Sequence, residues 1–274
     1  MTRTKYLLTL MKLLVGMLLV LGIPAHPQSS VQAQPQSPGS QRLPTNWGNY
    51  QPPSGINTPN GREGGGSRGP CIKDAPNYAP IALVPLNTFG TTLAARPTFL
   101  VYVPPIQEGI TPSPQMQFTL RTSQNQEIYT TTFPSTSRRG IVSFSLPTAA
   151  NSPTLEMGKT YKWSFALVCN PDDPSGNKLA SGLIQRVAAS PRLTSELARS
   201  PSPRDKAAIY AKYGIWYDAV SAIAQLRRTS DNEGLKNDWI ALLSSVELQK
   251  IANEPLVQPV AASSNPRPPF SRQR

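Results

Sequence analysis

The stretch Leu155–Val187 reads LEMGKTYKWSFALVCNPDDPSGNKLASGLIQRV, and it decides the class of fold. Its apolar residues alternate with smaller or polar ones, and the apolar set is Tyr161, Trp163, Phe165, Leu167 and Cys169. A period of two predicts a half-buried strand with an aromatic inner face. The turn-rich segment 170–177 then predicts a loop, and 179–187 predicts a second strand that returns from it.

Other segments predict short strands because apolar or β-branched residues are bounded by proline, glycine or asparagine; they are 80–86, 98–103, 115–121, 127–133 and 140–146. Asn87–Gly90 predicts a turn after the earliest of them. About seven short strands with frequent turn signals indicate a mainly β fold, an antiparallel two-sheet, immunoglobulin-like sandwich. The likeness to immunoglobulins is architectural, since Trp163 shares its strand with Cys169 instead of lying on a strand between two cysteines.

Beyond these strands the apolar spacing changes to about 3.6 residues, which indicates helices. Ser202-Pro203 begins one helix, Gly214 ends it, and Trp216–Arg228 forms a second. Asp231 is expected to cap a third, whose apolar face is Leu235, Trp239, Leu242 and Val246. The three helices resemble part of a tetratricopeptide repeat but amount to fewer units than a repeat array needs. We expect a C-terminal helical segment that caps the sandwich, and a peptide-binding groove is the alternative.

The N-terminal segment 1–33 has the three parts of a secretory signal peptide: a basic start, an apolar run over 7–23 and a small-x-small end. Cleavage after Ala33 would leave Gln34 as the new N-terminus, and Ala25 marks a second candidate site. We therefore expect export to the periplasm or the extracellular space. An uncleaved signal, which would anchor the chain in a membrane, is the alternative.

Composition divides the remainder of the chain. Segment 34–70, rich in proline, glycine, serine and glutamine, predicts a disordered linker, and 256–274 a disordered basic tail. Between them we expect a β-sandwich domain over 71–190 and the helical segment over 191–255. The formal charge of +12 favours anionic surfaces such as acidic glycans, while export argues against nucleic acid. Basic residues that only maintain solubility are the alternative.

Cys71 and Cys169 are the only cysteines. In an oxidising compartment they predict one structural disulfide between the start of the domain and a central strand. The only histidine, His26, lies within the predicted signal peptide. A mature chain without histidine would lack serine–histidine and cysteine–histidine catalysis as well as the common zinc sites.

Several oxygen-bearing side chains could in principle serve metal binding or hydrolysis. Asp172 and Asp173, with Asn170 and Asn177 nearby, could supply calcium ligands, but their spacing matches no EF-hand and a plain turn accounts for them. A carboxylate-only hydrolase would need two acids from this loop and Glu108, Glu127 and Glu156 to meet across a cleft, and no pattern brings them together. The glycines at 64–66 follow no strand, so they predict no phosphate site. We expect no catalytic, cofactor-binding or metal-binding residue.

Several segments carry a family likeness in their order along the chain: Cys71, Ile81–Pro85, Arg96–Phe99 with Tyr102–Pro104, Gly140–Val142, Glu156–Trp163, Leu167–Cys169, Gly182–Arg186, Gly214–Ala219 and Asp238-Trp239. Together they resemble the cyanobacterial exported proteins of the domain-of-unknown-function family nine-two-eight. The resemblance runs from about Gly69 to Val257 and implies strands followed by helices. It implies no activity and supplies no site residues. Glu247 departs from the pattern, since relatives often have glycine there.

Two functions from different classes are consistent with the sequence. The leading hypothesis is a non-enzymatic interaction module of the periplasm or cell envelope that binds a protein partner through a sandwich edge or the helical face. The alternative is a carbohydrate- or cell-wall-binding module that uses the basic charge and exposed aromatic side chains, for which the candidates are Trp47, Tyr50, Tyr102 and Tyr129. The carboxylate-only hydrolase is the third and least favoured hypothesis.

Overall fold

The computed structural model describes residues 62–64, 71–72, 79–107, 109–110, 113–135, 138–149, 152–230, 232–257 and 260. All of them belong to one compact unit, which spans Arg42–Arg274. The predicted signal peptide, its cleavage site at Ala33 and Gln34, and the aromatic residues Trp47 and Tyr50 lie outside the described residues. Within the described ranges, no helix combines the length and the apolar character that crossing a membrane requires.

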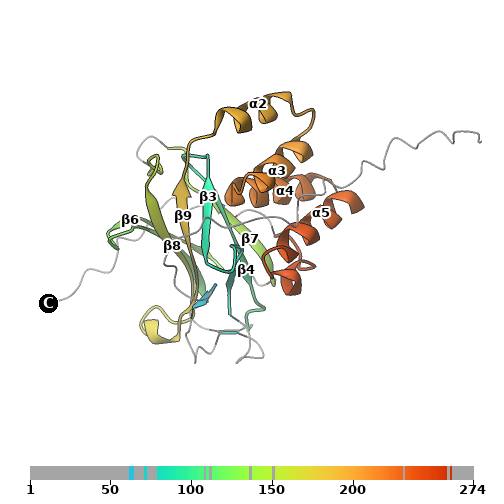
Figure 1. The fold of residues 1–274 in the computed structure, drawn as a ribbon. Helices are drawn as coiled ribbons and strands as arrows, with labels where there is room; N and C mark the ends of the chain where they lie inside the picture. The colour runs from blue at the N-terminus through green and yellow to red at the C-terminus, as the bar shows by residue number, and fades with distance from the viewer. Residues whose placement is uncertain are drawn as a thin grey trace, which may run out of the picture. The chain divides into compact units, whose positions relative to one another are not determined.

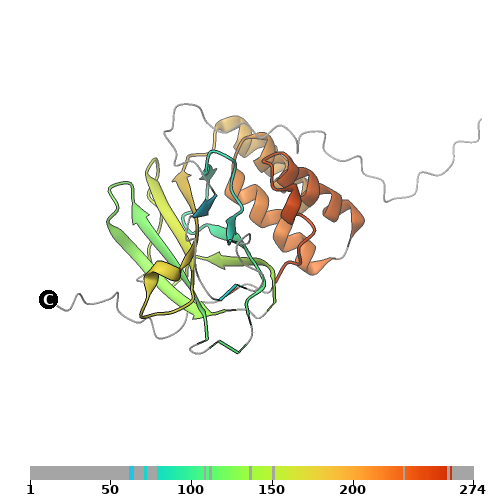
Figure 2. The same cartoon turned by 90° about the horizontal axis from the view of Figure 1, so that it is seen from below.

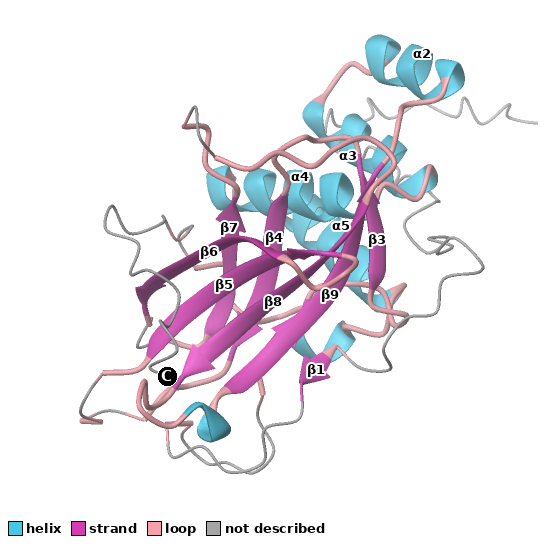
Figure 3. Ribbon diagram, turned by 90° about the vertical axis from the view of Figure 1, so that its left-hand side faces the viewer, coloured by secondary structure: helices cyan, strands magenta, loops and turns pink. Residues whose placement is uncertain are grey.

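The larger of two sheets has six strands: β1 (Glu63–Gly64), β3 (Phe89–Thr92), β5 (Gln115–Thr122), β6 (Glu127–Pro134), β8 (Thr160–Val168) and β9 (Lys178–Arg186). Their order is β1-β9-β8-β5-β6. Strand β3 also pairs with β9, at residues that follow those paired with β1. Figure 3 shows β6, β5, β8 and β9 side by side with the helices behind them. Strand β1 falls within the segment expected to be a disordered linker, and it pairs with β9.

The pairing of β3 corrects the antiparallel prediction, because β3 runs parallel to β9. The sequence also placed a turn over Asn87–Gly90, whereas Phe89 and Gly90 already belong to the strand. The chain turns earlier: the Thr88 amide donates to the Pro85 carbonyl at 2.8 Å, and Thr88 has a φ of 60°. Parallel neighbours need a long connection instead of a hairpin, so local sequence gave no signal for this pair.

The smaller sheet has the order β2-β4-β7, formed by β2 (Ile81–Ala82), β4 (Thr98–Val103) and β7 (Gly140–Ser145). The outer edge of β7 is covered by the chain that follows the helices. Ile141 N donates to Pro255 O at 2.8 Å, and Val260 N donates to Ser143 O at 2.9 Å. Leu256, Val257 and Val260 also pack against the core, so the tail predicted over 256–274 was placed too early.

Aromatic side chains from both sheets meet in one core. The ring of Phe118 in β5 lies 4.8 Å from that of Phe99 in β4 and 4.7 Å from that of Phe144 in β7, measured between centroids. Trp163 in β8 lies 5.1 Å from Phe99. The predicted alternation is confirmed over most of β8, since its inner-face residues are buried and Lys162 and Ser164 between them are partly exposed; Ala166, also expected on the outer face, is buried.

Four helices follow the strands and gather on one side of them (Figures 1 and 2): α2 (Pro191–Arg199), α3 (Pro203–Lys212), α4 (Trp216–Thr229) and α5 (Glu233–Ser244). Short 3-10 turns cover Pro174–Gly176 and Gln249–Ile251. The predicted helices α3 and α4 are confirmed, and Gly214 after α3 has the left-handed φ of 72° that ends a helix.

Two helix predictions need correction. Helix α2 was missed, although Ser190-Pro191 repeats the Ser-Pro signal of α3 and the Ser190 side chain accepts a hydrogen bond from Leu193 N. Helix α5 is capped by Asn232 instead of Asp231: the Asn232 Oδ1 accepts from Gly234 N at 2.7 Å. An asparagine and an aspartate side by side are equally good caps, so sequence could not separate them.

Candidate functional site

The disulfide predicted from sequence is present, joining Cys71 to Cys169 with 5.3 Å between their Cα atoms. Both cysteines are buried, and Gln107 N donates to Cys71 O at 2.9 Å. The bond spans 98 residues of sequence, a loop whose closure stabilises by about 4.7 kcal/mol in the chain-entropy model. No thiol is left for redox chemistry among the described residues.

Three of the acids considered for hydrolysis or calcium binding, Glu127, Glu156 and Asp173, bond to a local partner. Glu127 forms an ion pair with Arg121 at 3.0 Å, and Glu156 forms one with Lys159 at 2.8 Å. In the loop after β8, Asp173 accepts from Ser175 N and Oγ, and these hydrogen bonds lower the pKa of its carboxyl.

The same loop is an ordinary turn, because Asn170 Oδ1 accepts from Asp172 N at 2.9 Å. Within the described ranges, which leave out Glu108, no three histidine, cysteine or acidic side chains group as metal ligands would. The described acidic side chains therefore do not identify a catalytic or metal-binding site.

The tyrosines proposed as sugar platforms belong to the core or its margin. Tyr102 in β4 is buried, so its prediction as an exposed platform is wrong. Tyr129 in β6 is half-buried and stacks on Phe144 with 13° between the ring planes. Burial raises the pKa of the Tyr129 hydroxyl. Tyr102 therefore offers no open face to a sugar, and Phe144 occupies one face of Tyr129.

The segment Gly214–Ala219, which carries much of the family likeness, fastens α4 to both sheets. Trp216 is fully buried, and its Nε1 donates to Leu83 O at 2.8 Å beside β2 in the smaller sheet. Tyr217 is also buried, and its hydroxyl donates to Leu183 O of β9 at 3.0 Å in the larger sheet.

The same tyrosine hydroxyl accepts from Trp163 Nε1 at 2.7 Å, which links the helix to the central strand β8. Two glycines make room for these rings. A Cβ at Gly90 would lie 2.8 Å from the Tyr217 ring, and one at Gly182 would lie 2.9 Å from the Trp163 indole. These motif residues are occupied in joining helix to sheet, so they are structural and form no open site.

Asp218 completes the junction as a buried acid. One carboxylate oxygen accepts from Thr92 Oγ1 at 2.6 Å and from Leu93 N at 3.2 Å. Burial raises the pKa of this carboxyl, and the hydrogen bonds from Thr92 and Leu93 oppose that shift. The group faces the sheet, where it holds the end of β3, and no described cavity includes it.

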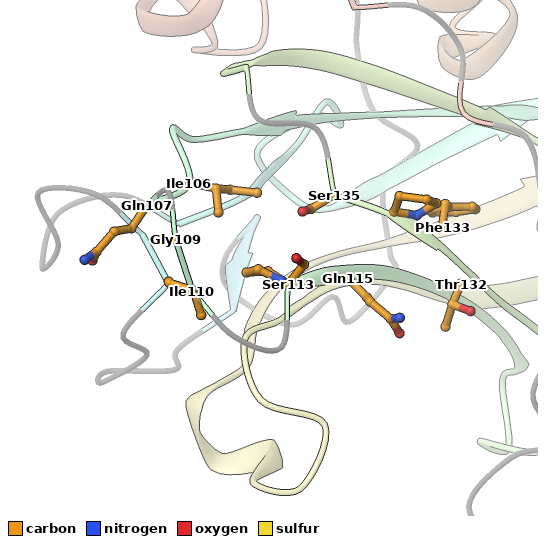
Figure 4. Close-up of a pocket in the computed structure, with 11 residues that line it drawn as sticks. Ile106, Gln107, Gly109, Ile110, Ser113, Gln115, Thr132, Phe133 and Ser135 are labelled. Carbon is orange, nitrogen blue, oxygen red and sulfur yellow. The ribbon is translucent and has the colours of Figure 1, made fainter.

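A cleft of about 620 Å³ lies where β5 begins and β6 ends (Figure 4). Residues of the loop after β4 form one side, and residues that flank or belong to β5 and β6 form the other. Among the described residues, the polar side chains around it are uncharged amides and hydroxyls: Gln107, Gln115, Ser113, Thr132 and Ser135.

Apolar residues complete the lining of the cleft, among them Ile106, Ile110 and Phe133. Amides and hydroxyls can both donate and accept hydrogen bonds, as a peptide backbone or a neutral polar ligand requires. None of these residues was predicted from sequence, because glutamine, serine and threonine at the ends of strands are common in ordinary loops.

The cleft adjoins the open edge of the larger sheet. Among the described strands, β6 pairs only with β5, so one side of its backbone has no partner strand. The corresponding edge of the smaller sheet, at β7, is instead covered by the chain's own residues 255–257 and 260. The two edges therefore differ: the edge of β7 is covered, and the edge of β6 has no partner strand in the described part of the chain.

A family model described as Domain of Unknown Function (DUF928) matches residues 63–256. The matched segment begins at β1 and ends where the chain reaches the edge of β7. A search of curated proteins finds no match.

Proposed function

This chain belongs to the protein family described as Domain of Unknown Function (DUF928). From the features of its own surface, we propose that it is a non-enzymatic interaction module of the periplasm or cell envelope. The partner is a protein that presents an extended segment. That segment pairs with the edge of β6 and places a side chain in the adjoining cleft. The single observation that carries the proposal is the open edge of β6 beside a cleft of about 620 Å³.

The chain itself supplies a precedent for this mode of binding. At β7 an extended segment lies along the sheet edge through main-chain hydrogen bonds, and its Val257 and Val260 side chains pack on the core. Strand addition is a common way for proteins to recognise extended peptides, with main-chain bonds giving affinity and side-chain pockets giving specificity. The edge of β6 with its cleft has both parts.

The architecture in this proposal is a sandwich with a helical cap. The aromatic contacts between Phe99, Phe118 and Phe144 support two facing sheets, and the bonds of Trp216 and Tyr217 support a cap fixed to both of them. A helical cap tied to the sheets in this way uses its apolar face for packing. This favours the sheet edge over a tetratricopeptide-like groove as the surface for a partner.

The proposed location rests on the N-terminal sequence and is supported by the Cys71–Cys169 bond, since disulfides persist mainly in oxidising compartments. Cell fractionation followed by mass spectrometry of the intact chain tests it. We expect the periplasmic or extracellular fraction to hold a chain that begins at Gln34 with both sulfurs oxidised. A reduced, uncleaved chain in the cytosol would contradict it.

The binding proposal is tested with Thr132→Arg, which places a long charged side chain in the cleft. Thr148→Arg is the matched control, because it adds the same charge on an exposed loop after β7. We expect partners captured from native envelopes by the unmodified protein to be kept by Thr148→Arg and lost by Thr132→Arg, with circular dichroism unchanged in both.

Hydrogen exchange with the purified partner gives the second readout. Pairing along β6 should slow exchange of the outward backbone amides in Glu127–Pro134. Capture that survives Thr132→Arg, or a bound partner that leaves β6 unprotected, would exclude this edge as the binding surface.

A further inference from the structure

The outer face of the larger sheet carries a row of hydroxyl groups. Strand register places four hydroxyl-bearing residues opposite one another on neighbouring strands: Thr130 in β6, Thr119 in β5, Ser164 in β8 and Ser181 in β9. Because neighbouring strands are about 4.8 Å apart, this hydroxyl row extends about 14 Å across the sheet. It lies on the face opposite the aromatic core, and Figure 3 shows these strands in front of the helices.

The two ends of the hydroxyl row differ. Thr119 and Thr130 bond to each other, with 3.2 Å between their oxygens. Ser164 and Ser181 are partly exposed and make no side-chain hydrogen bond to another described residue. Two hydroxyls on adjacent strands are therefore available to a ligand.

Two cations lie directly beside these serines. Arg121 on β5 and Lys162 on β8 lie opposite one another. Each is two residues along its strand from Thr119 or Ser164, so both lie on the same face as the hydroxyl row. Arg121 forms an ion pair with Glu127, whereas Lys162 Nζ bonds the neutral Asn125 Oδ1 at 2.9 Å. The charge of Lys162 is thus not balanced by a carboxylate among its described partners.

A depression of about 170 Å³ joins the cations to the hydroxyls. Its polar lining consists of Arg121, Asn125, Lys162, Ser164 and Ser181, and no carboxylate of a described residue lines it. Two cations, an amide and two hydroxyls around one small hollow match an oxyanion such as a carboxylate or sulfate group.

We propose that this depression binds the charged group of an acidic polysaccharide, while the hydroxyl row bonds the sugar hydroxyls beside it. Lys162 and Arg121 hold the carboxylate or sulfate, and Ser164 and Ser181 contact the neighbouring sugar. The positive formal charge of the whole chain, +12, is complementary to such a polymer. This surface lies apart from the cleft beside β6 and does not depend on the proposed protein partner.

The same face argues against two other anionic ligands. Single-stranded nucleic acids need aromatic rings on which bases stack, and the outward residues of β5, β6, β8 and β9 include none. A membrane surface would need exposed apolar side chains around the cations. The two apolar side chains that line the depression, Trp163 and Leu183, are instead buried.

The test measures binding of the full chain to dextran sulfate, with uncharged dextran as the comparison polymer. Lys162→Gln removes the central cation, and Lys236→Gln on α5 removes the same charge from a surface away from the depression, where Lys236 pairs with Glu233. We expect saturable, salt-sensitive binding to dextran sulfate, weakened about tenfold by Lys162→Gln and less than twofold by Lys236→Gln.

The hydroxyl contribution is tested with Ser164→Val, which preserves a strand-forming residue. We expect it to weaken binding about threefold, without changing the salt dependence. Equal losses in the two lysine variants would show that binding follows net charge and would overturn the site. Absence of saturable binding, or equal binding to anionic lipid vesicles with the same dependence on Lys162, would overturn it as well.

Discussion

Helices α4 and α2, which α3 separates in sequence, are held by different forces. Six residues of α4 are buried, and three side chains in its first turn bond to the sheets. Helix α2 buries only Leu193 and is tied to the end of α3 by Glu196, which contacts Lys212 and Tyr213 at 2.8 Å. The difference shows that α4 is anchored to the sheets whereas α2 is peripheral, although both helices carry the same kind of sequence signals.

The largest expected effect on stability comes from disrupting the anchor of α4 at Trp216. Trp216→Ala deletes a fully buried ring and leaves Leu83 O without its donor. We expect a loss of about 3–5 kcal/mol in the free energy of unfolding, measured by urea denaturation. Leu193→Ala in α2 is the comparison, and it should cost clearly less because one side of that helix faces solvent. Equal losses in the free energy of unfolding for the two variants would contradict the distinction between an anchored α4 and a peripheral α2.

Tyr217→Phe should have the next largest effect. It removes one hydroxyl and leaves both Trp163 Nε1 and Leu183 O buried without a hydrogen-bond partner from this residue. We expect a loss of about 1–3 kcal/mol, with little change in overall structure. Tyr213→Phe, which removes the hydroxyl that contacts Glu196, is the matched control, and its thermal unfolding should be unchanged.

The variant Asp218→Asn tests the anchor of α4 through the pH dependence of the free energy of unfolding. Burial raises the pKa of the Asp218 carboxyl above the value of 3.8 expected in the unfolded chain. The folded state therefore binds this proton more tightly, so its contribution is most favourable at low pH and decreases as pH rises through the folded pKa. The variant should be at least as stable at about pH 7 and show a flatter stability profile above about pH 4. An unchanged profile would refute this role.

Glu196→Gln should have the smallest effect, with the opposite sign of pH dependence. Hydrogen bonds from Lys212 and Tyr213 lower the pKa of Glu196 from 4.5 to about 2. This stabilisation is present above the unfolded pKa and is lost as pH falls toward the folded value. We expect faster hydrogen exchange in α2 at neutral pH and unchanged global unfolding. Faster hydrogen exchange in α4 in the same variant would contradict an independent α2.

How far sequence reaches can be judged residue by residue. The alternation around Trp163 and the serine-proline start of α3 predict their elements because strand and helix signals are local. Strand β3 escaped prediction because its partner β9 lies far along the chain and pairs in parallel. The cleft escaped it because Gln115 and Ser135 have no special composition, and only the fold brings them together.

By itself the sequence determined the strand-then-helix order, the family and the partners of the disulfide, because periodicity, motif spacing and a count of two cysteines are properties of a linear chain. Only the tertiary structure decided that Trp216, Tyr217 and Asp218 serve as a junction, since their bonding partners lie in β-strand segments more than thirty residues away. It also decided which sheet edge is closed, because the chain returns to β7 and leaves β6 open among the described strands. Long-range contacts of this kind depend on loop closure in three dimensions, which no local pattern encodes.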